Sequence, residues 1–316
     1  MGISHYIKEI GRGARGARPL DRAQAADLFG QVLDGSVTDL EIGAFCLAMR
    51  IKGETSAELA GFLDATAARS ALFPATPGLP VVVLPSYNGA RRLPVLTPLL
   101  ALLVARAGLP VLVHGSATES SRVTSQEVFA HLGIQPLAQV RAIAPGEVVF
   151  ASTELLCPGL KRLLDVRRVV GLRNPAHSVV KLMNPCAGPA LLVASYTHPA
   201  YAESMAETFA VLGATALLSR GMEGEVVADP RRTAELTGFR TGAPVQLQAQ
   251  APGTASEVPG LPATTDAAAA ADYTRAVLEG TCALPEPIAR QLEHLLLLAR
   301  AMGADAPTTP AATETA

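Results

Sequence analysis

The sequence predicts a small N-terminal helical domain followed by a larger α/β domain with a mainly parallel central sheet. Helix-start signatures crowd the first 70 residues, short continuous apolar runs begin after Gly78, and these runs then alternate with helical segments. The 316 residues are enough for two domains that share one interior. We expect a helical domain over 1–72, completed by inserted helices at about 158–185, an α/β domain over 78–157 and 186–303, and a disordered tail over 306–316.

The helical opening is predicted from repeated capping boxes. In a capping box the first side chain accepts from a free amide of the helix, and the residue three positions later reaches back to the first. The first two predicted helices end at Gly35 and Gly53, where a left-handed residue closes a helix. The spacing occurs at Asp21 with Gln24, Thr38 with Glu41, and Thr55 with Glu58.

The α/β part is predicted from buried strands that alternate with helices. Val81–Tyr87 and Leu109–Gly115 are apolar without interruption, as expected for strands covered on both faces. Thr97–Ala107 between them has helical length, and another capping box at Thr124 and Glu127 begins a helix that closes on Gly133. The further strands are predicted at Val148–Ser152, Leu191–Tyr196 and Ala214–Arg220, and the further helices at Leu160–Val170, Ala176–Met183, Pro199–Leu212, about Ala270–Glu279, and Glu286–Met302.

Charge and hydropathy narrow the class of protein. The net charge of −2 argues against a uniformly basic protein, but the basic residues are segregated. Between Lys161 and Lys181, Asp165 is the one acidic residue among six basic ones. A second basic run lies in the glycine-rich opening of the chain. That opening is either a flexible electrostatic tether or a solvated linker. We expect a cytoplasmic protein, because residues 1–20 are too polar for a signal peptide and no apolar run has the length of a membrane span.

Two polar loops leave adjacent predicted strands and suggest an anion site. In an open parallel sheet, ligands bind beyond the carboxyl ends of the strands. The loops at 86–92 and 114–122 combine hydroxyls, glycine and arginine, and the second leads into a helix, so backbone amides and guanidinium groups suit a phosphate. The alternative is that both are solvated turns. His114 could face a ligand or be hydrogen-bonded within its turn.

Across these loops the chain resembles anthranilate phosphoribosyltransferase. The glycine-rich diphosphate loop of that family, GTGGDG, falls on Leu84–Gly89, its NIST segment falls on Pro94–Thr97, and its KHGNR falls on Val113–Ala117. The double serine that follows falls on Ser120 and Ser121. Other matches are HPAMK on Cys157–Lys161, the next arginine on Arg167, LGxR on Val170–Arg173, and Asn-Pro on Asn184–Pro185. The resemblance implies a nucleoside phosphorylase/phosphoribosyltransferase-like fold. It also implies a phosphate or ligand crevice with Ser86, Tyr87, Asn88, Gly89, Thr97, His114, Gly115, Ser116, Ser120 and Ser121.

The departures from the family pattern argue against the family's reaction. Early glycines of the diphosphate loop become Leu84, Ser86 and Tyr87, whose Cβ atoms would obstruct close approach of the backbone to phosphate. The Lys and Arg of KHGNR become Val113 and Ala117. The acidic DGLDE segment that holds magnesium in the family falls on 223–227, where Glu-Gly-Glu replaces the adjacent pair. We therefore expect no catalytic residue, no metal ligand and no cofactor, and magnesium only if a transferase reaction survives.

IKEIGRG near the start, Leu84–Arg91 and Arg220–Val226 are similar to the YbiB branch of this superfamily. That resemblance implies a homodimer, formed through the helical domain, that binds DNA or RNA non-specifically in a basic groove. The alternative is a phosphoribosyltransferase or related glycosyltransferase with an unknown acceptor. Few aromatics could stack bases, and Tyr87 is the best-placed candidate. The residues expected to bind nucleic acid are Lys8, Arg12, Arg15, Arg91, Arg92, Arg122, Lys161, Arg162, Arg167, Arg168, Arg173 and Lys181.

Overall fold

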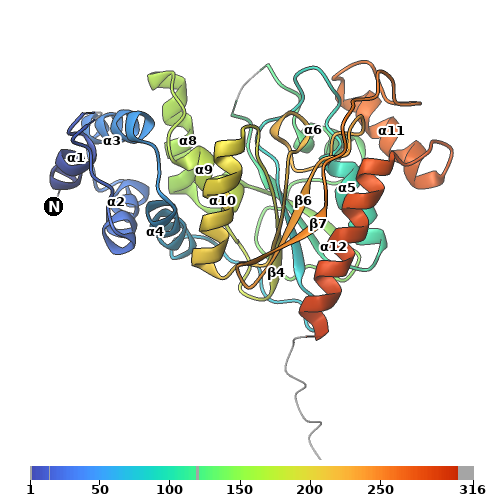
Figure 1. The fold of residues 1–316 in the computed structure, drawn as a ribbon, viewed down its shortest axis with the longest axis horizontal. Helices are drawn as coiled ribbons and strands as arrows, with labels where there is room; N and C mark the ends of the chain where they lie inside the picture. The colour runs from blue at the N-terminus through green and yellow to red at the C-terminus, as the bar shows by residue number, and fades with distance from the viewer. Residues whose placement is uncertain (1, 14, 119–120, 305–316) are drawn as a thin grey trace, which may run out of the picture.

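A computed structural model describes residues 2–13, 15–118 and 121–304, and confirms the predicted helical domain and α/β domain. The helical domain forms one end of the molecule (Figure 1). All the predicted capping boxes are present, and Glu58 of the third box is buried and also accepts from Leu20 N. The helices of this domain are α1 (Ser4–Ile10), α2 (Arg22–Asp34), α3 (Asp39–Lys52) and α4 (Ser56–Ala67).

The α/β domain is built on a seven-stranded sheet in the order β3-β2-β1-β4-β5-β6-β7. The strands from β3 to β5 run parallel, while β6 and β7 are antiparallel to their neighbours. The bounds are β1 Val81–Pro85, β2 Val111–Gly115, β3 Val148–Ser152, β4 Ala190–Ser195, β5 Ala216–Ser219, β6 Leu236–Arg240 and β7 Ala243–Gln248.

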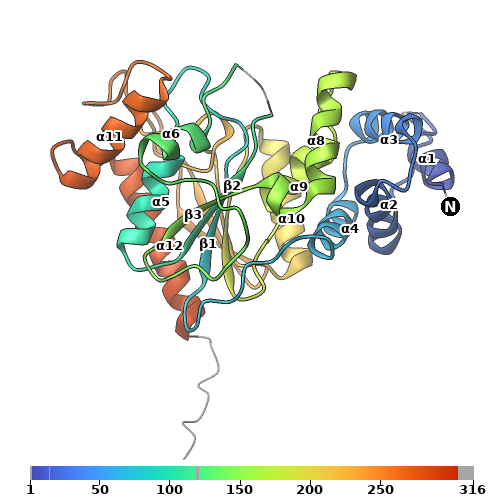
Figure 2. The same ribbon diagram turned by 180° about the vertical axis from the view of Figure 1, so that it is seen from behind.

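Helices cover both faces of the sheet, as Figures 1 and 2 show. Successive residues of β1 pack into different layers, Val82 and Leu84 into one and Val81 and Val83 into the other, which explains its unbroken apolar run. One face carries α5 (Thr97–Arg106), α6 (Ser125–His131), α11 (Ala267–Glu279) and α12 (Glu286–Ala304). The other carries α9 (Ala176–Leu182) and α10 (Pro199–Leu212), while the short α7 (Thr153–Leu156) leads into α8 (Pro158–Val170).

The helices α8, α9 and α10 join the two domains. The helix α4 packs against α9 and α10, and α8 packs against α2. In both ribbon views α8 lies between the outermost helix α1 and the sheet (Figures 1 and 2). The helical domain is therefore held against the α/β domain through α8, α9 and α10.

The sequence analysis missed the β6–β7 hairpin. A two-residue turn connects these strands, with Thr241 at φ 46° and Gly242 at φ 84°. Positive φ at both central residues fits the twist of an antiparallel hairpin. The sequence signal is weak because Gly238 and Pro244 interrupt the pattern typical of strands.

Several predicted boundaries were wrong by a few residues. The first strand ends at Pro85 instead of Tyr87, because the amides that follow turn toward Glu225. The helix expected at about Ala270 begins at Ala267, because the Asp266 side chain caps it by accepting from Ala269 N. The tail predicted over 306–316 lies outside the described residues.

The strand order places a topological switch point between β1 and β4. From β1 the chain continues through β2 and β3 on one side, and it returns to place β4 on the other. The loops that follow β1 and β4 therefore diverge, and such a divergence opens a crevice at the carboxyl ends of the strands.

Candidate anion site and basic crevice

The two polar loops predicted from the sequence lie side by side. Ala90 N donates to Val123 O at 2.7 Å, and Thr118 Oγ1 donates to Tyr87 O at 2.9 Å. Gly115 lies so close to the first loop that an added Cβ would stand 1.9 Å from Ser86 O. Only glycine fits at that position, so the close approach of the two loops depends on it.

A carboxylate of the chain itself fills the space between the two loops. Glu225 is buried, and its Oε1 accepts from Asn88 N at 2.8 Å and from Gly89 N at 2.9 Å. Its Oε2 accepts from Ser86 Oγ at 2.5 Å and from Thr97 Oγ1 at 2.9 Å. We call this set of four donors, on Ser86, Asn88, Gly89 and Thr97, the cradle.

A second carboxylate holds the next part of the same loop. Glu223 Oε2 accepts from Arg91 N at 2.7 Å, and both carboxylate oxygens lie 3.1 Å from Arg92 N. Its backbone has φ 54°, in the left-handed region that is unfavourable for a residue with a side chain. The strained turn at 222–224 is thus stabilised by the hydrogen bonds of Glu223 and Glu225 to the loop after β1.

The donors predicted to bind an anion are therefore used within the chain. Two backbone amides and two hydroxyls that converge on one point suit a phosphate group, and here they bind Glu225. The two carboxylates also do not fit magnesium, because their oxygens accept from amides and hydroxyls of the loop instead of facing a substrate phosphate. The described residues contain no group of three or more His, Cys, Asp or Glu side chains that could hold a metal ion.

Tyr87 and His114 form a buried pair beside the cradle. Tyr87 Oη and His114 Nδ1 lie 2.9 Å apart, and Thr153 Oγ1 lies 3.1 Å from the same hydroxyl. Burial lowers the pKa of His114 to about 3, so its ring is neutral. The prediction that Tyr87 could stack on a base is wrong, because its ring is buried and contacts His114 edge to face. His114 is thus hydrogen-bonded, but to Tyr87 of the other loop and not within its own turn.

The remaining predicted crevice residues lie along the second loop. Ser116 Oγ accepts from Thr153 N at 3.2 Å, and Ser121 is exposed. Ser120 lies outside the described residues.

The basic residues of α8 divide into bound and exposed side chains. Lys161 pairs with Asp165 on the same helix, and Arg162, although exposed, donates to Leu33 O at 2.7 Å. Arg168 is 66% exposed and lies 3.5 Å from Asp165, while Arg167 is partly buried.

Other predicted basic residues lie around the loops at the carboxyl ends of the strands. Arg91 and Arg92 have exposed side chains, whereas Arg122 donates to Asn88 O at 2.9 Å. Arg173 and Lys181 line a cavity of about 200 Å³ between the domains. The structure thus places Arg91 and Arg92 on the loop after β1, Arg168 on α8, and Arg173 and Lys181 in the cavity between the domains.

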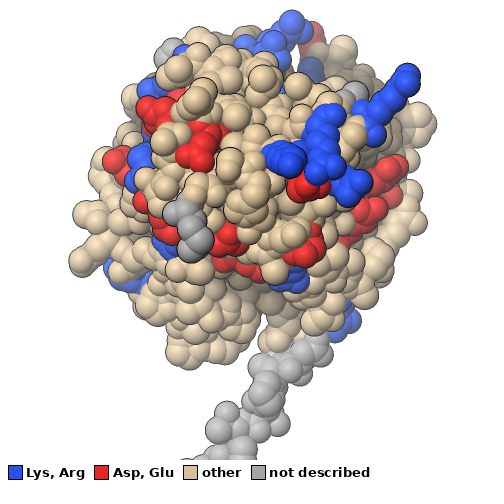
Figure 3. Space-filling view, turned by 90° about the vertical axis from the view of Figure 1, so that its left-hand side faces the viewer, with Lys and Arg blue, Asp and Glu red and all other residues tan. Residues whose placement is uncertain are grey.

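The N-terminal basic residues lie elsewhere. Lys8 is on α1, and Arg12, Arg15 and Arg18 follow it in a turn closed by Arg18 N donating to Glu9 O at 3.0 Å. Viewed from the helical end, lysine and arginine side chains gather at the upper right, with acidic side chains below them (Figure 3). In both ribbon views α3 and α8 lie between α1, the outermost helix, and the sheet (Figures 1 and 2).

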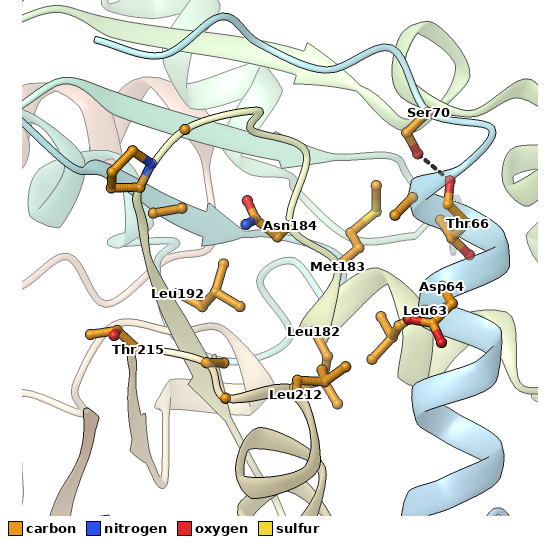
Figure 4. A pocket seen from close by; sticks show the side chains of 16 residues that line it. Leu63, Asp64, Thr66, Ser70, Leu182, Met183, Asn184, Leu192, Leu212 and Thr215 are labelled. Carbon is orange, nitrogen blue, oxygen red and sulfur yellow. Dashed lines mark hydrogen bonds between the residues drawn. The ribbon is translucent and has the colours of Figure 1, made fainter. Parts of the chain in front are cut away.

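A larger cavity lies at the opposite end of the sheet. It has a volume of about 390 Å³ and is lined by α4 and by the segments that enter β4 and β5 (Figure 4). Its polar groups have partners, since Ser70 Oγ donates to Thr66 O and Asp64 binds Arg22. It faces the amino ends of the strands, so it is not the candidate site.

Comparison with known proteins agrees with this architecture. Residues 4–70 match a family described as glycosyl transferase family, helical bundle domain. The uncharacterized protein YbiB of Escherichia coli is 39% identical over 304 residues, which cover 94% of each chain. The chain belongs to the YbiB family. The helical-bundle match and the enzyme relatives described next also place this chain in the anthranilate phosphoribosyltransferase superfamily.

Enzymes of the superfamily are more distant from this member of the YbiB family. Anthranilate phosphoribosyltransferase of Methylobacterium radiotolerans is 30% identical over 229 residues, covering 70% of this chain and 66% of that one. The crystal structure of the Thermus thermophilus enzyme has a TM-score of 0.68 at 22% identity, covering 96% of this chain and 90% of that one. This second likeness shows the fold alone.

Sequence reasoning found the loops but missed two groups of residues. Glu223 and Glu225 were considered only as weakened metal ligands, because they lie far along the chain from the loop that they bind and no local motif marks the contact. Arg50 and Tyr201 line the cavity with Arg173 and Lys181, and no local motif marks them, because they come from α3 and α10.

In the described part of the chain no helix is long and apolar enough to cross a membrane.

Proposed function

We propose that the protein binds DNA or RNA in the cytoplasm as a homodimer, through the phosphate backbone and without base-sequence preference. The observation that carries the proposal is the contrast between the cradle, which Glu225 fills, and the exposed cations around it. With the cradle amides engaged, phosphate contacts fall to side chains on the rim, such as Arg91, Arg92 and Arg168. Spaced cations on a surface suit a polymer of phosphates.

Phosphoribosyl transfer is the competing function, and relatives that carry that enzyme's name support it. It would require the diphosphate to displace Glu225 from four donors. It would also require Glu223 or Glu225 to release the loop before either could bind magnesium. Binding of phosphoribosyl diphosphate with release of pyrophosphate would favour this function over ours.

The test is fluorescence anisotropy of a labelled oligonucleotide across a salt series. An Arg92→Ala, Arg168→Ala variant removes two exposed cations near the crevice, and an Arg290→Ala, Arg300→Ala variant removes two from α12. We expect tight, salt-sensitive binding, with a log–log slope that is shallower in the first variant by about one for each phosphate that it no longer binds. The α12 variant should behave as wild type. Absence of binding at low salt would refute the function.

We propose that the homodimer forms through an apolar face of α1 and α3. Leu40 is 85% exposed and Ile51 65% exposed, and Leu47 lies beside Ile51 in a concavity of about 460 Å³ that Ile7 and Ile10 also line. Exposed apolar side chains that cluster on one face indicate a protein contact. A Leu47→Glu, Ile51→Glu variant should elute at monomer mass in light scattering, and a dimer that persists would place the interface elsewhere.

A further inference from the structure

A small cavity opens between the two domains at the switch point of the sheet. It has a volume of about 200 Å³ and is bounded by α3, α9, the end of β4 and the start of α10. We call it the hinge cavity. Sites for drug-sized ligands are about 300–1,000 Å³, so this smaller cavity suits one unit of a larger ligand whose remainder lies outside. It lies where the loops after β1 and β4 diverge.

Lys181 supplies an unpaired cation to the hinge cavity. Its side chain is largely buried, and within the described residues its ammonium has no hydrogen bond or ion pair. Burial, with repulsion from Arg173, lowers the pKa of Lys181 to about 8, while Glu225 opposes this change. The ammonium is therefore still charged at neutral pH, and a buried charge without a partner is unfavourable. An anion in the cavity would remove that penalty.

Two guanidinium groups reinforce the positive charge. Arg50 from the end of α3 and Arg173 from the segment before α9 both line the cavity and are exposed. Glu54 is the acid in the lining, and burial raises its pKa, so its negative charge is disfavoured. His177 is neutral, since burial lowers its pKa to about 4, and its Nε2 has no partner in the described structure. The lining of the cavity thus carries a net positive charge and a neutral histidine that can form a hydrogen bond, and both favour an anion.

An exposed aromatic ring stands in the same lining. Tyr201, in the first turn of α10, is 46% exposed, and its ring centroid is 6.2 Å from that of His198. In the binding of single strands, bases stack on tyrosine without strong preference for their identity. The combination of cations and an accessible ring is the chemistry that recognises a nucleotide.

We propose that the hinge cavity binds one nucleotide of a single strand, with the phosphate on Lys181, Arg50 and Arg173 and the base against Tyr201. The inference rests on the proposed function and specifies the kind of strand. A base within a duplex is paired and stacked, so it reaches such a cavity only after it is flipped out. Single strands are therefore favoured over duplexes at this site.

The test compares binding of labelled oligo(dT) and of a hairpin duplex by wild type and three variants. Lys181→Met removes the charge and keeps much of the apolar stem, while Tyr201→Ala removes the ring and Tyr201→Phe keeps it. Tyr201→Ala should weaken oligo(dT) binding by roughly 5- to 150-fold, the effect of removing one stacked base. Lys181→Met should weaken it by about tenfold or more, and Tyr201→Phe should stay near wild type. Duplex binding should change little in all three.

Competition separates the possible sources of the phosphate. Thymidine monophosphate should compete with oligo(dT) better than inorganic phosphate does, and Tyr201→Ala should abolish the difference. Equal competition by the two would overturn the base contact. Oligo(dT) binding that survives both Lys181→Met and Tyr201→Ala but is abolished in Arg92→Ala, Arg168→Ala would overturn the hinge cavity alone. Wild type that binds neither strand type would overturn the proposed function and this inference together.

Discussion

The cradle follows β1 and the hinge cavity lies at the end of β4, and the two sites differ in how their charge is balanced. In the cradle, one buried carboxylate meets two amides and two hydroxyls, so donors and acceptor are matched within the chain. In the hinge cavity, Lys181 has no hydrogen bond or ion pair among the described residues, and Arg50 and Arg173 have exposed side chains. The first arrangement stabilises the fold, whereas the second leaves charge for a ligand. The comparison suggests that anion binding has moved from backbone amides to side chains.

The largest expected effect comes from emptying the cradle. Glu225→Ala leaves two buried amides without an acceptor, which should lower the free energy of unfolding by about 2–6 kcal/mol. Glu225→Gln keeps an acceptor for the amides and fills the same volume, so it should cost only about 1–2 kcal/mol. Urea unfolding of both variants measures the difference. Equal decreases would mean that the charge, and not the filled cradle, carries the effect.

The same variant tests whether the cradle is still an anion site. Pyrophosphate or propionate should raise the melting temperature of Glu225→Ala, because either can replace the missing carboxylate. Neither should raise that of wild type or Glu225→Gln, in which the cradle is filled. A rise in wild type would show that an external anion competes with Glu225.

A smaller effect of opposite sign is expected for Lys181. Its pKa in the folded protein is lowered to about 8 from 10.5, so the folded state holds this proton less tightly than the unfolded state. The destabilisation caused by its burial is therefore at its full size below pH 8. It decreases as the pH rises from 8 toward 10.5, so the protein becomes more stable over that range. Lys181→Met should raise the free energy of unfolding at pH 7 by up to about 3 kcal/mol. Urea unfolding at several pH values should show that this gain shrinks above pH 8, and a decrease at pH 7 would contradict the unpaired charge.

The smallest of these effects concerns His177 and acid stability. Its folded pKa is lowered to about 4 from 6.5, so the unfolded chain takes up the proton first as pH falls. The stability it contributes is present above pH 6.5 and is lost between pH 6.5 and 4. His177→Gln should flatten that part of the pH profile by about 1–2 kcal/mol. An unchanged slope would mean that His177 is protonated in the folded state as well.

Local signals predicted the fold well, and long-range contacts explain what was missed. The capping boxes at Thr38 and Thr124 were readable because both partners lie three residues apart. Glu225 and Asn88 are 137 residues apart, so their pairing had no local signature. The surroundings of Tyr87 were misjudged for the same reason, since its burial depends on His114 and Thr153. Arg50 reaches the hinge cavity only because the two domains pack together.

The account holds that anions bind to side chains of the hinge cavity and not to the backbone amides of the cradle. Its most direct test is a crystal structure of the protein with a short oligo(dT). We predict a phosphate beside Lys181, with Glu225 still bound to the amides of Asn88 and Gly89. A phosphate on those two amides, with Glu225 displaced from them, would contradict the account and would point to the transferase site instead.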